Sequence, residues 1–563
     1  MSDLSASRSG ADLVVDCLVT EGVTSVFGLP GTTIMELIDS LARREGIGYL
    51  STRHEQVAAF MADGFSRSGA GLGVAVVSRG PGAANAAIAV QNAHDESVPM
   101  LLLVGQVPGQ IVERGAFEEM DVVASFGPFC KWAVEIRQVD RVPELLQRAV
   151  RTAVAGRPGP VVVSIPLDVL QTPTDIQPAR RFRQHPPGPD PAAIHSAVDL
   201  LERATSPVIV LGGGASAADP AEVERLAERS GSPVVTTWMR KGQVPNDSPC
   251  FVGSLGYGAF TSTEAVVESA DVILAIGCRF SEFSTKRWTI IPAEASLIHV
   301  DIDPTELGRI YIPEVGLVAD ASLALSALNA QLETRAPVAG AAARSARLLG
   351  LRDRFNEDAR VSLGTVEPGS LETVASPALV VALQRLVDRD DVVLVQDVHS
   401  FGPWIHRYVR FDRIGAFYGS AGGAMAWGFP ASIGIALGRP DSRVVSISGD
   451  GSFWMVAQDF ETCVREAIPV VNLVVNNFAY GNTRDRQRFA HDGRYAGVFL
   501  GNPDFGEFAR MLGGYGERVT DPLDLGAAID RALAQDKPAI VDIVQDQMEG
   551  LPNGLEPLTT RES

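Results

Sequence analysis

The sequence has few cysteines and no paired cysteine motif. Its five cysteines stand far apart without a CxxC pair, which argues against a disulfide framework and against a zinc cluster. Long apolar runs are also lacking, because none approaches the ~18 residues that span a bilayer. Residues 1–12 are polar where a secretory signal would carry its apolar core. We therefore expect a soluble, cytoplasmic protein with reduced thiols and no membrane partner.

Positive charge is in deficit. Lys and Arg number 48 against 68 Asp and Glu, which gives a formal net charge of −20. A negatively charged surface repels polyanions, so we do not expect a nucleic-acid partner. The chain has 563 residues, of which 46% are hydrophobic. At roughly 100–200 residues per domain, this length predicts about three domains with substantial cores.

Short apolar runs alternate with stretches of helical period along the whole chain. Such runs are typical of parallel strands covered by helices on both faces. They occur at 73–78, 99–105, 161–167, 207–211, 271–276, 392–396, 443–448, 470–475 and 538–544. The fold class predicted is α/β, with doubly wound domains whose sheets are mainly parallel.

Two stretches interrupt this rhythm and serve as candidate linkers. Residues 172–192 are rich in Pro and Arg, and residues 330–378 are rich in Ala, Arg and acidic residues without a strand signal. They divide the chain into domains at about 1–175, 190–335 and 375–550. Residues 551–563 lack periodicity and are expected to form a C-terminal tail, either frayed or folded over a site.

A glycine-rich loop follows one of the expected strands. Gly449-Asp450-Gly451-Ser452 comes directly after 443–448, and Asn477 follows 470–475. The glycines allow close backbone approach, and a helix opening at Ser452 would present free N–H groups to a phosphate. A carboxylate and an amide oxygen at one sheet edge suit Mg²⁺. A GDG triplet alone is also a common turn sequence.

The stretch from Gly449 to Asn477 resembles the thiamine-diphosphate motif, which begins with GDG and ends with NN after a helix and a strand. Other segments resemble the acetolactate synthase branch of that family, in order over nearly the whole chain. They are STRHEQVAAFMADGFSR (51–67), VVSRGPGAANA (76–86), GAFEEMD (115–121), GPFCKWAV (127–134), SIPLDV (164–169), HVDIDPTELGR (299–309) and GAMAWGFPASIGIALG (423–438).

The resemblance implies a set of site residues. Asp450, Asn477 and the backbone carbonyl of Ala479 would ligate Mg²⁺. Glu55 would be the catalytic residue, hydrogen-bonded to N1′ of the cofactor's aminopyrimidine, where a carboxylate favours loss of the C2 proton. Met425 would hold the cofactor in its bent form. The other residues implied to contact thiamine diphosphate are Gly449, Gly451, Ser452, Gly423, Pro81, Asn85, Ser400 and Tyr480.

These residues also have structural interpretations that the sequence leaves open. Glu55 could be a surface helix charge, Met425 a core residue and Asp450 a helix cap. The resemblance further implies a homo-oligomer, a dimer or a tetramer. In this family the first domain of one subunit and the third domain of its partner share each cofactor.

The sequence departs from acetolactate synthase on the expected substrate side. Glu118 stands where the family's GAFQEVD segment has glutamine, and Asn482 and Arg486 stand where it has Met and Trp. Polar and cationic side chains there favour a polar or anionic substrate. Arg486 could instead face solvent on a lid. Lys131 matches a family lysine near the substrate channel, or it is a surface charge.

The expected function is that of a thiamine-diphosphate-dependent decarboxylase or carboligase. It would act on small 2-oxo acids or aldehydes and pass an acyl carbanion equivalent to an acceptor. The central domain carries Gly212-Gly213-Gly214 after a strand, which suits a dinucleotide, so FAD is a further candidate cofactor. Three alternatives stay open: an FAD-linked oxidoreductase of pyruvate-oxidase type, an aldehyde or 2-hydroxyacyl lyase, and a non-catalytic family member.

Overall fold

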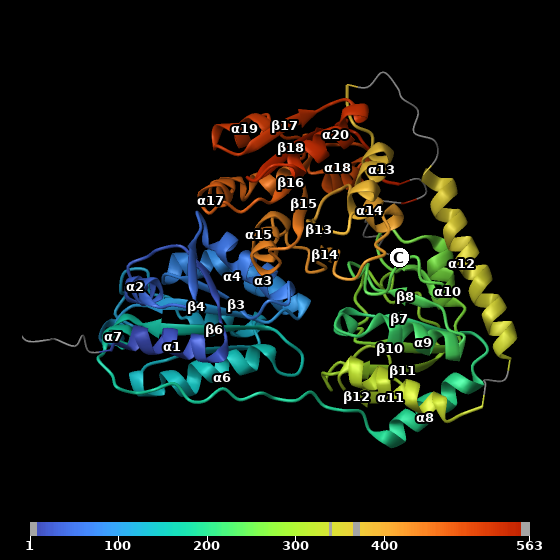
Figure 1. Cartoon of the computed structure of the whole chain (residues 1–563), viewed down its shortest axis with the longest axis horizontal. Coiled ribbons are helices and arrows are strands. Elements are labelled where there is room, and N and C mark those ends of the chain that lie inside the picture. The colour runs from blue at the N-terminus through green and yellow to red at the C-terminus, as the bar shows by residue number, and fades with distance from the viewer. Residues whose placement is uncertain (1–7, 337–339, 364–371, 553–554, 556–563) are drawn as a thin grey trace, which may run out of the picture.

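Three six-stranded sheets organise the chain. The computed structural model describes residues 8–336, 340–363, 372–552 and 555, and every strand pairing within its three sheets is parallel. Figure 1 shows a first domain in blue and teal, a central domain in green, and a third domain in orange and red beside both. Within the described residues, no helix combines the length and apolar composition that a membrane span needs.

The first domain has helices on both faces of its sheet. Alternate residues of the third strand along the chain enter two separate cores, with Val74 and Val76 in one and Ala75 and Val77 in the other. In spatial order its strands are β2 (Gly48–Ser51), β1 (Ser25–Gly28), β3 (Gly73–Val77), β4 (Met100–Gln106), β6 (Pro160–Pro166) and β5 (Trp132–Glu135). Its helices are α1 (Gly10–Glu21), α2 (Met35–Arg43), α3 (Glu55–Arg67), α4 (Gly80–Glu96), α5 (Val122–Phe126), α6 (Val142–Val154) and α7 (Leu167–Gln171).

The central domain repeats this plan. Its strands in spatial order are β12 (Val315–Val318), β11 (Ser296–Asp301), β10 (Val272–Ile276), β7 (Pro207–Leu211), β8 (Val234–Thr236) and β9 (Phe251–Ser254). Its helices are α8 (Pro191–Arg203), α9 (Pro220–Ser230), α10 (Thr261–Glu268) and α11 (Ala321–Glu333). The long helix α12 (Ala341–Leu363) runs along its outer side (Figure 1).

The third domain carries the GDG segment. Its strands in spatial order are β14 (Phe417–Gly419), β13 (Val392–Gln396), β15 (Arg443–Gly449), β16 (Val471–Asn476), β18 (Ala539–Val544) and β17 (Tyr515–Val519). Its helices are α13 (Ser376–Val387), α14 (Gly402–Tyr408), α15 (Gly428–Gly438), α16 (Asp450–Trp454), α17 (Phe460–Arg465), α18 (Gly481–Ala490), α19 (Phe505–Met511) and α20 (Pro522–Leu533).

The predicted α/β class with parallel sheets is confirmed, and each apolar run named above overlaps a strand. The first candidate linker has no helix or strand over residues 174–190, whereas the second contains the long helix α12. That helix was not predicted because its outer face is polar and the stretch reads as charge-rich. Most of the expected tail, residues 553–554 and 556–563, lies outside the described residues.

Helices α3 and α15 join the first and third domains at very short range. A Cβ atom on Gly64 would lie 2.1 Å from the carbonyl oxygen of Ala431, and one on Gly434 would lie 2.0 Å from that of Met61. Only glycine allows the two backbones to approach this closely. The contact sets how the first domain lies against the third.

Candidate active site

Asp450 and Asn477 lie at the carboxyl ends of two neighbouring strands. Strands β15 and β16 pair in parallel, with Gly449 opposite Val475, so the residues that follow them meet at one sheet edge. This neighbourhood was predicted from the sequence. The helix after the loop begins at Asp450, two residues before the expected Ser452, because the Asp450 backbone is already helical.

The Asp450 carboxylate is buried and held in place by amides. It is 2% exposed, and its Oδ2 accepts a hydrogen bond of 2.7 Å from Asn502 Nδ2, which also donates to Asn476 Oδ1. Burial raises the pKa of Asp450 to about 6, against the opposing effect of backbone N–H donors and Asn502. A buried carboxylate with little compensating charge is the kind of ligand that a cation stabilises.

Two further residues with oxygen atoms that could bind a metal, Asn477 and Ala479, adjoin Asp450. Asn477 is buried, its Oδ1 accepts from the Ala479 N–H at 3.2 Å, and its Nδ2 donates to Ser400 Oγ at 3.3 Å. Phe478 between them has φ of 52°, a left-handed turn. A carboxylate, an amide and a backbone carbonyl form a hard oxygen set that fits Mg²⁺. The described residues contain no group of three or more His, Cys, Asp or Glu for a softer metal.

The loops around these residues are packed so tightly that positions 451 and 481 have no room for a side chain. A Cβ atom on Gly451 would lie 2.5 Å from Tyr480 Cε1, and one on Gly481 would lie 2.5 Å from Ser400 Oγ. The predicted residues Gly451, Ser400 and Tyr480 are therefore brought together with Asn477. We call this close-packed cluster of Ser400, Gly451, Asn477 and Tyr480 the cradle. Glycine at 451 and 481 lets the backbone approach its neighbours closely, as binding of a compact anion such as a diphosphate would require.

Ser452 connects this cradle to the segment that carries Met425. Its Oγ accepts a hydrogen bond of 2.8 Å from the Ala426 N–H. Met425 is half-buried in the loop between β14 and α15, and Gly423 in the same loop is exposed with φ of 75°. The hydrogen bond to Ser452, a residue predicted to contact the cofactor, thus fixes the Ala426 end of this loop beside the cradle.

The site includes two residues that were not predicted. Asn502 positions Asp450 from an irregular segment that carries no motif. His399 is buried beside Gly449, where a Cβ atom would lie 3.0 Å from His399 Cβ. Its position directly before Ser400 was the only sequence signal for it.

A second group of predicted residues meets in the first domain. Glu55 is the first residue of α3, is 8% exposed, and accepts a hydrogen bond of 2.9 Å from Asn85 Nδ2 of α4. A Cβ atom on Gly82 would lie 3.3 Å from Glu55 Oε1, and Pro81 precedes that glycine. Both helices begin at the carboxyl edge of the first sheet. Glu55 is therefore a buried, oriented carboxylate and not a surface helix charge.

Two of the predicted substrate residues, Glu118 and Lys131, lie at opposite edges of the first sheet. Glu118 is exposed beside the start of α4, where its carbonyl accepts from the Gly80 N–H and its carboxylate pairs with Arg79 at 2.9 Å. Lys131 immediately precedes β5 at the opposite, amino edge of the first sheet, and its Nζ donates to the Ala155 carbonyl. The structure does not bring Lys131 to the edge that carries Glu55.

Asn482 and Arg486 are exposed on α18, which begins at the cradle. They are four residues apart, so they share one face of the helix. Arg484 on the same helix is fully buried and ion-paired with Asp485 at 2.7 Å. It also donates to the carbonyls of Gln547 and Glu549, which ties the segment after β18 to α18.

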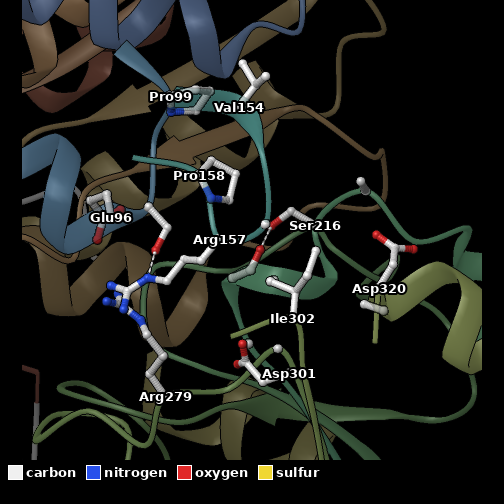
Figure 2. Close-up of a pocket in the computed structure, with 18 of the residues that line it drawn as sticks. Glu96, Pro99, Val154, Arg157, Pro158, Ser216, Arg279, Asp301, Ile302 and Asp320 are labelled. Carbon is white, nitrogen blue, oxygen red and sulfur yellow. Dashed lines mark hydrogen bonds between the residues drawn. The ribbon is translucent and has the colours of Figure 1, made fainter. Parts of the chain in front are cut away.

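A large cavity opens at the carboxyl edge of the central sheet. Its volume is about 1540 Å³, and Gly212 is among its lining residues. Figure 2 shows Arg279, Asp301 and Asp320 in the lining of the same cavity. A Cβ atom on Gly212 would lie 2.1 Å from the Gly277 carbonyl oxygen. Burial lowers the pKa of Arg279, and nearby Arg157 lowers it further. The clustered guanidinium groups favour an anionic ligand, and the volume fits a dinucleotide.

Comparison with known proteins assigns each of the three domains to one class. Residues 8–125 match the thiamine pyrophosphate enzyme N-terminal TPP binding domain, residues 194–328 match the central domain, and residues 397–543 match the C-terminal TPP binding domain. Thiamine pyrophosphate is another name for thiamine diphosphate.

The curated relatives narrow this class. The chain is 32% identical to a probable acetolactate synthase large subunit of Methanocaldococcus jannaschii, over 96% of this chain and 93% of that one. It is 30% identical to the acetolactate synthase isozyme 3 large subunit of Escherichia coli, over 96% and 95% of the two chains. It is 33% identical to a probable acetolactate synthase 2 of Oryza sativa, over 96% and 84%. The chain therefore belongs to the thiamine pyrophosphate enzyme family, in its acetolactate synthase-like branch.

Proposed function

We propose that the chain is a thiamine-diphosphate- and Mg²⁺-dependent carboligase that decarboxylates a 2-oxo acid and transfers the acyl unit to a second carbonyl compound. The observation that carries this proposal is the convergence of Asp450, Asn477 and Ala479 at one sheet edge. Burial raises the pKa of the Asp450 carboxyl to about 6, and a bound cation would stabilise its charged form. The chain's relatives named acetolactate synthase support the same reaction class.

The residues at the two strand ends and in the first domain have distinct roles in this proposal. Asp450, Asn477 and the Ala479 carbonyl would hold Mg²⁺, and the loops at Gly449, Gly451 and Ser452 would hold the diphosphate. Thiamine diphosphate supplies a carbon nucleophile for 2-oxo acids. Glu55, oriented by Asn85, would hydrogen-bond N1′ of the cofactor's aminopyrimidine and hold a proton at that nitrogen.

A complete site is proposed to need two copies of the chain. Glu55 belongs to the first domain and Asp450 to the third, and the described contacts join residues within each group. We infer a homodimer or homotetramer in which one copy's first domain meets the other copy's third domain. A cytoplasmic location is also proposed, supported by five buried cysteines without disulfides.

The substrate is proposed to be polar or anionic. Asn482 and Arg486 share an exposed face of α18, one helical turn apart, next to the cradle. Glu118 replaces the family's glutamine with an acid, but its ion pair with Arg79 offsets part of that negative charge. An exposed guanidinium there favours a carboxylate or a phosphate on the substrate.

FAD is proposed as a second cofactor, in the cavity of the central domain. Gly212 lines the cavity without a side chain, and Arg157, Arg240 and Arg279 would face the phosphates. Asp301 ends a strand, where it would bind a ribose hydroxyl. This cavity also supports the second candidate function, an oxidoreductase of pyruvate-oxidase type. A lyase that cleaves 2-hydroxyacyl compounds would use the same third-domain residues.

A substrate panel separates these functions. The protein is incubated with thiamine diphosphate, Mg²⁺ and a series of 2-oxo acids and aldehydes, and CO₂ release and coupled product are measured together. CO₂ release with a matching amount of carbon–carbon coupled product supports the carboligase. Bleaching of flavin absorbance without coupled product would establish the oxidoreductase instead. If no member of the panel reacts, the proposed activity is contradicted.

A further inference from the structure

The carboxyl edge of the third sheet contains a buried imidazole without a described hydrogen-bond partner. His399 follows β13, is 8% exposed, and neither its Nδ1 nor its Nε2 has a partner among the described residues. Burial lowers the pKa of His399 to about 3, so the ring is neutral, with one N–H donor and one acceptor. Leaving both buried and unpaired costs free energy that a bound ligand can recover.

The surroundings of His399 belong to the candidate metal end of the site. Its Cβ atom would lie 3.0 Å from a Cβ on Gly449, the residue directly before Asp450. The next residue, Ser400, accepts a hydrogen bond from Asn477. The ring of Phe401, which is itself buried, lies nearly parallel to the imidazole at 6.1 Å between centroids. His399 thus lies beside the end of β15, and its neighbour Ser400 contacts Asn477, which follows β16.

We propose that the imidazole of His399 donates a hydrogen bond to the diphosphate of the cofactor. This inference rests on the proposed function and adds a binding residue to it. The diphosphate is favoured over the reacting end of the cofactor because the neighbours of His399 are the glycine loop and the proposed metal ligands. The residues expected at the reacting end, Glu55 and Met425, lie in other segments. A neutral donor to an anionic oxygen adds affinity without burying another charge.

Binding measurements test this inference without relying on turnover. Apo-protein with Mg²⁺ is titrated with thiamine diphosphate and, separately, with thiamine, and binding is followed by tryptophan fluorescence and by calorimetry. The variants are His399→Phe, which keeps an aromatic ring, His399→Ala, which removes bulk, and His399→Gln, which keeps a donor. His406→Phe is the matched control, because His406 is also buried and its Nε2 lies 3.3 Å from the Ser254 carbonyl oxygen, away from the cradle.

We expect His399→Phe and His399→Ala to weaken thiamine diphosphate binding about tenfold or more, the loss for one hydrogen bond to a charged group. Thiamine affinity should change little, and His399→Gln should restore part of the difference. His406→Phe should leave the preference for the diphosphate unchanged. The two non-donor variants differ in bulk, so either one that folds gives the comparison.

Three outcomes would overturn the inference. The first is an unchanged affinity for thiamine diphosphate in His399→Phe or His399→Ala. The second is an equal loss for thiamine and thiamine diphosphate, which indicates a structural role. The third is that both non-donor variants fail to fold while His399→Gln folds but binds thiamine diphosphate no more tightly than thiamine. A wild-type protein that does not bind thiamine diphosphate would instead overturn the proposed function.

Discussion

Arg240 of the central domain donates a hydrogen bond of 2.9 Å to the carboxylate of Glu96, at the end of α4 in the first domain. The same carboxylate accepts from Arg67 of α3 at 3.1 Å and from the Ala421 N–H of the third domain at 3.0 Å. One buried side chain therefore connects all three domains. Ala421 lies in the same loop as Met425, and both Arg240 and Glu96 line the central cavity.

Substituting Glu96 should loosen this junction in a pH-dependent way. Burial alone would raise the pKa of Glu96, but the charges and hydrogen bonds of Arg240 and Arg67 lower it from 4.5 to about 2. A depressed pKa contributes stability that is present above about pH 4.5 and is lost as the pH falls toward 2. We expect Glu96→Gln to lose on the order of 3 kcal/mol at pH 7.

The measurement is the melting temperature of wild type and Glu96→Gln between pH 7 and pH 4. The stability difference should narrow by about 1 kcal/mol at pH 4, where the unfolded-state carboxyl is mostly protonated and the folded-state one is still ionised. Glu144→Gln is a suitable control, since the carboxylate of Glu144 on α6 forms an exposed pair with Arg141, which precedes the helix. A difference that is constant across this range would show that the Glu96 charge is not what holds the junction.

The contact between α3 and α15 can be tested with one methyl group. A Cβ atom on Gly434 would overlap the carbonyl oxygen of Met61, so Gly434→Ala must force the two helices apart. We expect a loss of about 2 kcal/mol, typical of overpacking. Gly350→Ala in α12 is the matched control, because no atom lies within 4 Å of its added Cβ. Helix propensity there favours alanine by about 0.5–1 kcal/mol.

Thermal unfolding distinguishes the two glycine variants by sign. Gly434→Ala should lower the melting temperature, and Gly350→Ala should raise it or leave it unchanged. Equal shifts in both variants would mean that the close approach of the helices is not needed for stability.

The residues at the strand ends of the third domain could be predicted from the sequence, whereas the residues that hold them by hydrogen bonds could not. Asp450 and Asn477 follow apolar runs directly, and parallel strands bring such residues to one edge. Asn502 lies 52 residues beyond Asp450 along the chain, in a segment without periodicity, so nothing local points to its hydrogen bond. Lys131 was assigned from a motif alone, although a residue before a strand lies at the opposite edge from one after it.

Removing the charge of Asp450 should weaken metal-dependent cofactor binding. Asp450→Asn keeps the shape of the side chain but lacks the carboxylate that Mg²⁺ prefers. We expect the affinity for thiamine diphosphate in the presence of Mg²⁺ to fall about tenfold or more. Calorimetric titration with and without Mg²⁺ measures the change.

Asp459→Asn is the control for this experiment. Asp459 is also buried in the third domain, but it accepts hydrogen bonds from the Arg53 N–H and Thr462, away from the cradle. Its substitution should affect stability and not the dependence on Mg²⁺. A Mg²⁺ response of Asp450→Asn equal to that of wild type would remove Asp450 from the metal site.

Glu55→Gln tests the proposed catalytic carboxylate. Glutamine keeps the contact with Asn85 but cannot hold a negative charge next to the aminopyrimidine. Turnover should fall about 100-fold or more, with thiamine diphosphate affinity changed only a few-fold. Glu45→Gln, at an exposed position before β2, should leave both quantities unchanged. Unaltered turnover in Glu55→Gln would assign catalysis to another residue.

Arg486→Trp tests the proposed preference for polar or anionic substrates. The exposed guanidinium on α18 would attract a substrate carboxylate or phosphate, and tryptophan would favour an apolar group instead. The Michaelis constant should rise about tenfold for charged substrates and change little for uncharged ones. Arg488→Trp is the control on the same helix, where the guanidinium lies 5.6 Å from the Phe489 ring. Steady-state kinetics on paired substrates measure the effect, and an equal rise for charged and uncharged substrates would mean that Arg486 does not read substrate charge.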